Sequence, residues 1–145
     1  MKRIPGLRDL SEDHHLGLVL ARTARKAAAG KGALSVGDAW AEIEGKFTTE
    51  LEPHFRIEES LIAPALVRLG ESQLAQRLLD DHATLRELLV PGCDRTATGL
   101  ARFGELLDKH IRFEERELFE VAQAKLGDDE LSRIAQACSA KNGGK

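Results

Sequence analysis

The chain has 145 residues, of which 42% are hydrophobic and 31% charged, and its formal net charge is −3. This balance is typical of one folded globular domain and excludes an intrinsically disordered chain. Because no basic stripe is present, we expect no nucleic-acid partner. No apolar run is long enough to span a membrane, and the first residues lack the apolar stretch of a signal peptide. We therefore expect a cytoplasmic protein with no membrane partner.

The two cysteines, Cys93 and Cys138, predict neither a disulfide framework nor a structural zinc site, because they do not form a CxxC pair. We interpret them as ordinary thiols. The sequence contains no tyrosine, which excludes mechanisms that need a tyrosyl radical, a phenolate ligand or a tyrosine acid.

Apolar residues recur at helical spacing along almost the whole chain. The first predicted helix spans residues 11–29, with Ser11 as its N-cap and with Glu12 and Asp13 in its positive first turn. The stretch "GKGALSVGD" ends this helix, because glycines and a serine interrupt the apolar pattern.

The second predicted helix spans residues 36–69 and ends at Gly70. It contains Pro53 and Pro64, which predict local kinks rather than an end, because the apolar pattern continues through both. Its apolar stripe consists of Trp40, Ile43, Phe47, Leu51, Leu61 and Ala65.

Two further long helices are predicted over residues 72–90 and 96–126, joined by the turn "PGCD" and followed by a shorter helix over 129–140. The pattern predicts an all-α fold: an up-down-up-down antiparallel four-helix bundle with a short extra C-terminal helix. The apolar stripes are Ala75, Leu78, Leu79, Leu85 and Leu89 on the third helix, and Leu100, Phe103, Leu106, Leu107, Phe113, Leu118 and Val121 on the fourth.

Histidines interrupt the apolar stripes of the second, third and fourth helices. His54, His82 and His110 each lie three residues after a leucine of the stripe, so they share its inward face. On the first helix the choice is between His14 and His15. Alanines follow His14 at seven and ten residues, whereas arginines follow His15 at the same steps, so His14 is the inward residue and His15 the alternative.

The sequence "HFRIEE" at 54–59 recurs as "HIRFEE" at 110–115. In both copies a glutamate, Glu58 or Glu114, follows the histidine by four residues and therefore projects from the same side of the helix. The next residues, Glu59 and Glu115, are rotated outward by about 100°, so we interpret them as solvated or as partners of the ligands rather than ligands.

The four inward histidines lie at similar depths in their helices, within about one or two turns, so they can meet in one layer. One inward histidine is usually an ordinary core residue, and one HxxxE pair can occur by chance. Four imidazoles and two buried carboxylates together would cost much free energy unless a cation joined them. Two metal ions about 3.5–4 Å apart can share two bridging carboxylates. Mixed nitrogen and oxygen ligands suit iron, and zinc and manganese fit less well.

The pattern H…HxxxE…H…HxxxE resembles the hemerythrin family, specifically the HHE cation-binding domains. The stretches "LSEDHHLGLVLA", "EPHFRIEE" and "HIRFEERELF" also resemble bacterial members. The similarity implies a single domain over residues 1–145 with a core of roughly 7–126, folded as a four-helix bundle around two iron ions joined by an oxo or hydroxo bridge. The metal ligands that the resemblance implies are His14, His54, Glu58, His82, His110 and Glu114.

The oxygen-carrying hemerythrins have one more histidine, one turn from the histidine of the third helix, and an aspartate in place of one glutamate. Here Leu78 and Arg86 lie four residues either side of His82, so the HxxxH pair is missing. The set is instead similar to di-iron proteins of iron–sulfur-cluster repair and to HHE proteins with proposed nitric-oxide, oxygen or iron-sensing roles. We therefore expect a protein that binds, senses or reacts with O₂, NO or peroxide, with an unidentified redox partner. His15 would restore a fifth nitrogen only if the first helix were rotated.

Two alternatives stay open at this point. An iron-storage site of ferritin type uses the order Glu-x-x-His, which here only Glu12 and His15 show. The other alternative is an iron sensor or a regulatory or interaction module without catalysis, and in the regulatory module the metal would only stabilise the native fold. The sequence contains no established set of catalytic residues, so it decides neither for nor against an enzyme.

Overall fold

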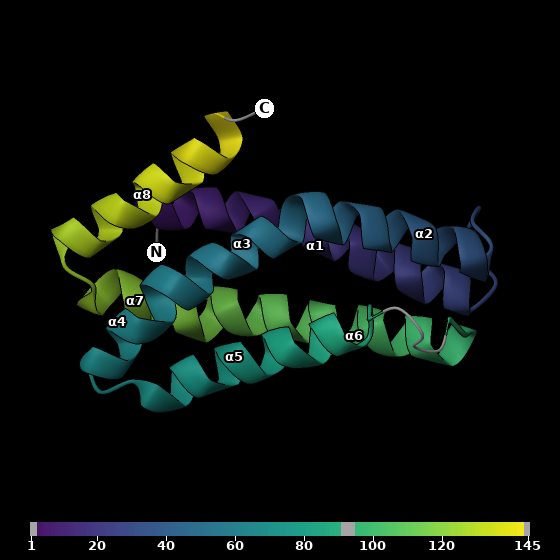
Figure 1. Ribbon diagram of the computed structural model, residues 1–145. Helices are drawn as coiled ribbons and strands as arrows, with labels where there is room; N and C mark the ends of the chain where they lie inside the picture. The colour runs from purple at the N-terminus through teal and green to yellow at the C-terminus, as the bar shows by residue number, and fades with distance from the viewer. Residues whose placement is uncertain (1–2, 91–94, 144–145) are drawn as a thin grey trace.

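The computed structural model describes residues 3–90 and 95–143, and within these ranges all regular structure is helical (Figure 1). The all-α prediction is confirmed, while the turn "PGCD" and Cys93 lie outside the described residues. In the described ranges, no helix combines the length and apolar character needed to cross a membrane. The α-helices are α1 (Pro5–Ala28), α2 (Val36–Lys46), α3 (Glu52–Ile57), α4 (Ala63–Arg68), α5 (Ser72–Glu87), α6 (Ala97–Phe113), α7 (Phe119–Lys125) and α8 (Asp128–Gly143), and the π-helical segments are η1 (Phe47–Leu51), η2 (Glu58–Ile62) and η3 (Glu114–Leu118).

Helix α1 begins six residues before the predicted start. Its N-cap is Ile4, and Pro5 occupies the first turn, where the fixed φ of proline suits a helix and its missing N–H is not needed. The buried Leu7 and Leu10 extend the apolar stripe in this direction. The prediction of Ser11 as N-cap is therefore wrong, and the two acidic residues after it lie in the second turn or beyond.

Segments α2, η1, α3, η2 and α4 follow one another without a break. Both π-helical segments of this stretch end two residues before a proline: η1 before Pro53 and η2 before Pro64. Because proline has no N–H and its ring clashes with the carbonyl one turn back, a wider turn accommodates it without ending the helix. The prediction that neither proline ends the helix is thus confirmed, and a π-helical turn precedes each proline. Gly70 ends the series with a φ of 83°, as expected for a glycine at a helix C-terminus.

Helix α5 ends at Glu87, three residues before the predicted end, and α6, η3 and α7 form one continuous segment that ends at Lys125. The inward placement of Leu79 was wrong, because its side chain is 39% exposed. The inward face of α5 runs through Leu78 and His82 and leaves Leu79 beside it. Helix α8 begins within one residue of the predicted start.

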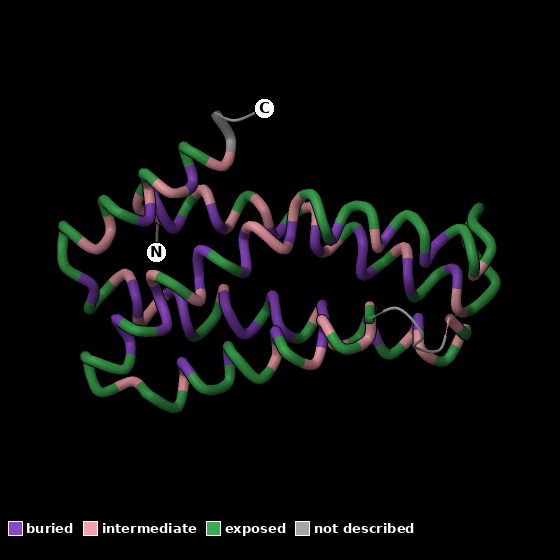
Figure 2. Tube along the Cα trace, viewed as in Figure 1, coloured by how far each residue is buried: buried purple, intermediate pink, exposed green. Residues whose placement is uncertain are grey.

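We call the four continuous helical segments rods: rod 1 is α1, rod 2 is α2–α4, rod 3 is α5, and rod 4 is α6–α7. The rods lie side by side lengthwise, with α8 placed across the outside of the bundle (Figure 1). Buried positions line the inside of the rods (Figure 2). They form two apolar clusters, one containing Leu66 and Phe119 and the other containing Trp40 and Phe103. On each rod the buried histidine lies close to the boundary between the residues of one apolar cluster and those of the other. A polar layer therefore crosses the core of this helical bundle between the two clusters.

Gly104 allows rods 1 and 4 to approach closely. A Cβ atom at this position would lie 2.8 Å from the carbonyl oxygen of Ala21, which cannot move without displacing α1. We therefore expect Gly104→Ala to lower the free energy of unfolding by about 1–3 kcal/mol in urea denaturation. The matched control is Gly45→Ala, at an exposed helical position with open space around it, which should raise stability by about 0.5–1 kcal/mol. Equal stability of both variants would contradict the close approach.

Candidate metal centre

Six polar side chains lie in the core of the described part of the chain, and none is more than 4% exposed. As the apolar pattern predicts, His14 faces inward while His15 is exposed. The structure therefore brings together the six residues singled out in the sequence and leaves the alternative outside. The six are His14, His54, Glu58, His82, His110 and Glu114.

Each rod contributes one imidazole to this layer, and rods 2 and 4 also contribute one glutamate each. Glu58 is the first residue of η2, and Glu114 is the first residue of η3. The two copies of the repeated motif therefore adopt the same local structure, an α-helical histidine followed by a glutamate that begins a π-helical turn. Such turns are frequent at functional sites because they shift the direction of the side chains within a helix.

The two glutamates lie between imidazoles of different rods. Glu58 contacts Nε2 of His54 and Nε2 of His82, both at 3.1 Å. Glu114 Oε1 lies 2.8 Å from Nε2 of His110 and 3.2 Å from Nε2 of His14. The ligand atoms form two groups of four, each within 4.8 Å of one another, and both glutamates belong to both groups. We call the group with His14 and His54 the first half-site, and the group with His82 and His110 the second half-site.

Although these inward-facing atoms lie close to one another, most of them make no contact with hydrogen-bond geometry among the described residues. They include Nε2 of His54, His82 and His110, both carboxylate oxygens of Glu58, and Oε2 of Glu114. A buried polar atom without a partner costs free energy, so native proteins rarely contain several in one place. Nitrogen and oxygen donors that converge in this way fit a divalent cation, and these groups could therefore hold a metal.

The opposite nitrogen of each imidazole donates a hydrogen bond to a carboxylate on another rod. This contact fixes the orientation of the ring and directs Nε2 into the layer. These contacts form a closed ring around the bundle. A carboxylate of rod 1 accepts from the imidazole of rod 2, one of rod 2 from rod 3, one of rod 3 from rod 4, and one of rod 4 from rod 1. The pairs are His54 Nδ1 with Asp13 at 3.0 Å, His82 Nδ1 with Glu59 at 2.8 Å, His110 Nδ1 with Asp81 at 2.8 Å, and His14 Nδ1 with Glu115 at 2.6 Å.

The four carboxylates of this ring, which we call the outer carboxylates, were only partly foreseen. Glu59 and Glu115 were expected beside the ligands, and they contact imidazoles from outside the layer. Asp13 and Asp81 were missed as site residues. Their signal in the sequence is that each directly precedes a histidine of the layer, in "EDHH" and "DDHA", just as Glu59 and Glu115 directly follow its glutamates.

The carboxylates favour positive charge on the imidazoles. Burial disfavours the charged form of His14 and His110, but Glu114, together with Glu58 and the carboxylate that each Nδ1 contacts, outweighs burial and raises the pKa of each to about 10. Burial likewise opposes charge on His54, yet Glu58 and Asp13 raise its pKa to about 9. Burial of Glu114 opposes its ionisation, but His110 holds the pKa of Glu114 well below its usual range. A metal ion that binds here would therefore have to displace protons.

Comparison with known proteins agrees with this geometry. The family model of the hemerythrin HHE cation binding domain matches residues 6–122, which include all six buried ligand candidates and all four outer carboxylates. Helix α8 lies outside the matched residues. No curated protein and no solved structure matches the chain significantly.

Proposed function

Because this chain belongs to the hemerythrin HHE cation-binding family, we propose that it holds two iron ions and uses them to bind, sense or react with a small molecule such as O₂, NO or peroxide. The observation that carries the proposal is the pair of four-ligand groups that share Glu58 and Glu114. The up-down-up-down four-helix arrangement, a cytoplasmic location and an unidentified redox partner belong to the same proposal.

In this proposal the first half-site supplies His14 and His54 to one ion, and the second supplies His82 and His110 to the other. Glu58 and Glu114 would be ligands to both ions, and the family resemblance implies an oxo or hydroxo bridge as well. Two imidazoles and two carboxylates per ion leave a position for a small molecule. Iron, when bound, would supply Lewis acidity and electrons, and the mixed donor set suits it better than zinc or manganese.

Apolar side chains pack against the imidazoles and shield the layer from solvent. The ring of Phe55 stacks on His82 with centroids 3.7 Å apart and planes 5° apart, and Phe119 stacks on His14 at 5.3 Å and 14°. Both phenylalanines are at most 1% exposed. A buried, apolar surround strengthens the interaction of the ligands with a cation and excludes water from a bound small molecule.

Two other functions receive less support from the site. Rod 3 supplies one imidazole, because Leu78 is part of the apolar core and Arg86 pairs with Glu52 and Glu59; this speaks against the ligand set of the oxygen carriers. The pair in the ferritin order, Glu12 and His15, is exposed on α1, which speaks against a storage site. A module whose metal only stabilises the fold is the second candidate that the experiment below must separate.

The test is anaerobic reconstitution of the protein with Fe(II), followed by exposure to O₂ or NO. We expect about two iron ions per chain and a change in the visible spectrum when the small molecule is added. Less than one iron ion per chain, with no spectral change, would contradict the proposal. If zinc raises the melting temperature strongly while the iron-loaded protein does not respond to O₂, NO or peroxide, the stabilising role is the correct one.

A further inference from the structure

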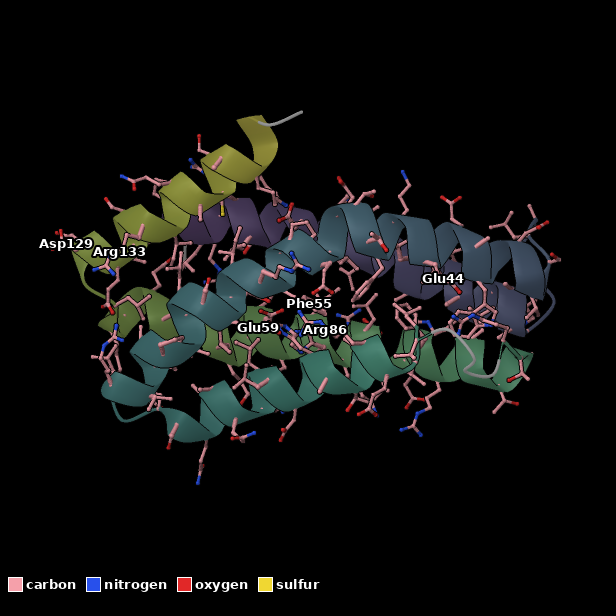
Figure 3. The ribbon with its side chains drawn as sticks, viewed as in Figure 1. Glu44, Phe55, Glu59, Arg86, Asp129 and Arg133 are labelled. Carbon is pink, nitrogen blue, oxygen red and sulfur yellow. The ribbon has the colours of Figure 1, made fainter. Side chains whose placement is uncertain are left out.

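Each outer carboxylate is itself paired with a cation, and the cations of the two half-sites come from different parts of the fold. In the second half-site both cations lie on α5, and Figure 3 shows one of them, Arg86, beside Glu59 and Phe55. In the first half-site one cation precedes α1 and the other lies on α8. The pairs are Glu59 with Arg86 at 2.6 Å, Asp81 with Arg77 at 3.7 Å, Asp13 with Lys141 at 2.8 Å, and Glu115 with Arg3 at 3.5 Å.

Lys141 contacts the atom that orients His54. Its ammonium group lies 2.8 Å from Oδ2 of Asp13, and the same oxygen accepts the hydrogen bond from Nδ1 of His54 at 3.0 Å. The side chain of Lys141 is 14% exposed and that of Asp13 is 25% exposed. Without the lysine, Asp13 is therefore free to turn toward water and release the imidazole.

Helix α8 is held firmly enough to place this lysine. It packs on α1, α3 and η2, and its Ile134 and Cys138 are completely buried. A Cβ atom at Gly6 would lie 3.0 Å from the backbone nitrogen of Ala135, so the two helices touch backbone to backbone at this point. The helix is nevertheless outside the residues that match the family model.

We propose that Lys141 of α8 positions the ligands of the first half-site, so that the metal affinity of this half-site depends on Lys141 and that of the second half-site does not. The inference rests on the proposed function, since it concerns the same metal centre. The lysine charge also repels a metal ion, but Asp13 and the imidazole ring separate the two. The loss of ring orientation is expected to outweigh the relief of that repulsion.

The test compares Lys141→Met in two backgrounds, with Co(II) as the probe and visible absorption or chelator competition as the readout. His82→Ala disables the second half-site and His54→Ala disables the first. We expect Lys141→Met to weaken Co(II) binding about tenfold in the His82→Ala background, the lower end of the range for partners of metal ligands. In the His54→Ala background it should change affinity less than about twofold. Lys141→Arg retains the cation and should restore most of the affinity.

The matched control removes another ion pair of α8, the exposed contact of Arg68 with Glu130 at 2.6 Å. Arg68→Met should leave Co(II) affinity unchanged, and thermal melting by circular dichroism shows that every variant is folded. An equal effect of Lys141→Met in both backgrounds, no effect in either, or an equal effect of Arg68→Met would overturn the role of Lys141. A wild-type protein that binds no metal would instead contradict the proposed function itself.

Discussion

Replacing either shared carboxylate, in Glu58→Gln or Glu114→Gln, should abolish the binding of both metal ions. Each carboxylate belongs to both four-ligand groups, so its loss removes one ligand from each half-site at once. Glutamine keeps the size of the side chain but loses the charge. Because changes to partners of the ligands alone cost about 10–100-fold in affinity, we expect a loss of more than about 100-fold. Metal analysis after Fe(II) reconstitution and gel filtration measures the result.

The histidines provide the comparison for this experiment. His14→Ala should remove one ion and leave the second half-site loaded, while His15→Ala should leave both ions bound because its side chain is exposed. A Glu58→Gln protein that retains one tightly bound ion would show that the carboxylates are not shared. A His15→Ala variant more damaged than His14→Ala would show that the orientation of α1 is wrong.

The free energy of unfolding of the metal-free protein should fall as the pH rises from about 6.5 to 9. His14 and His110 have pKa values raised to about 10 and His54 to about 9, against 6.5 for the unfolded chain. The folded state therefore binds more protons in this window, and the stabilisation is complete below pH 6.5 and is lost as the pH approaches the folded values. Each such imidazole contributes a slope of about 1.4 kcal/mol per pH unit. Urea denaturation at several pH values measures the slope.

Two further observations separate this effect from other titrations. Burial raises the pKa of the Cys138 thiol from 9.0 to about 12. This thiol therefore does not titrate between pH 6.5 and 9. Glu114→Gln should flatten the slope, because Glu114 is the largest source of the raised pKa of His14 and His110. Metal affinity should instead increase as the pH rises from about 6.5 to 9, because fewer protons must then be displaced from the ligands. A metal-free stability that stays constant or increases between pH 6.5 and 9 would contradict the charged state of the layer.

The inward histidines could be predicted because helical periodicity is a local property of the sequence. His54, His82 and His110 interrupt stripes of leucine and phenylalanine, and the arginines after His15 distinguish it from His14. The structure places these residues as the pattern indicates. Their role as metal ligands depends on the resemblance and on their convergence, and it stays a prediction.

Features that depend on the rotation of one rod against another could not be read from the sequence. Asp13 and Asp81 lie beside the inward faces of their helices, where periodicity predicts side chains exposed to solvent. Each nevertheless contacts an imidazole on the next rod. The start of α1 was misplaced because Ser11 is a good N-cap by type, whereas its hydroxyl donates a hydrogen bond to Glu115. Prolines predicted irregular turns, but nothing in the sequence specified π-helical ones at Glu58 and Glu114.

We infer that two metal ions bind in one layer, each between a pair of imidazoles and beside both glutamates. Anomalous diffraction at the iron edge, from crystals of the protein reconstituted anaerobically with Fe(II), tests it most directly. We expect two peaks, one between His14 and His54 and one between His82 and His110, each adjacent to Glu58 and Glu114. No peak in the layer, a single peak, or iron bound at the exposed His15 would contradict it.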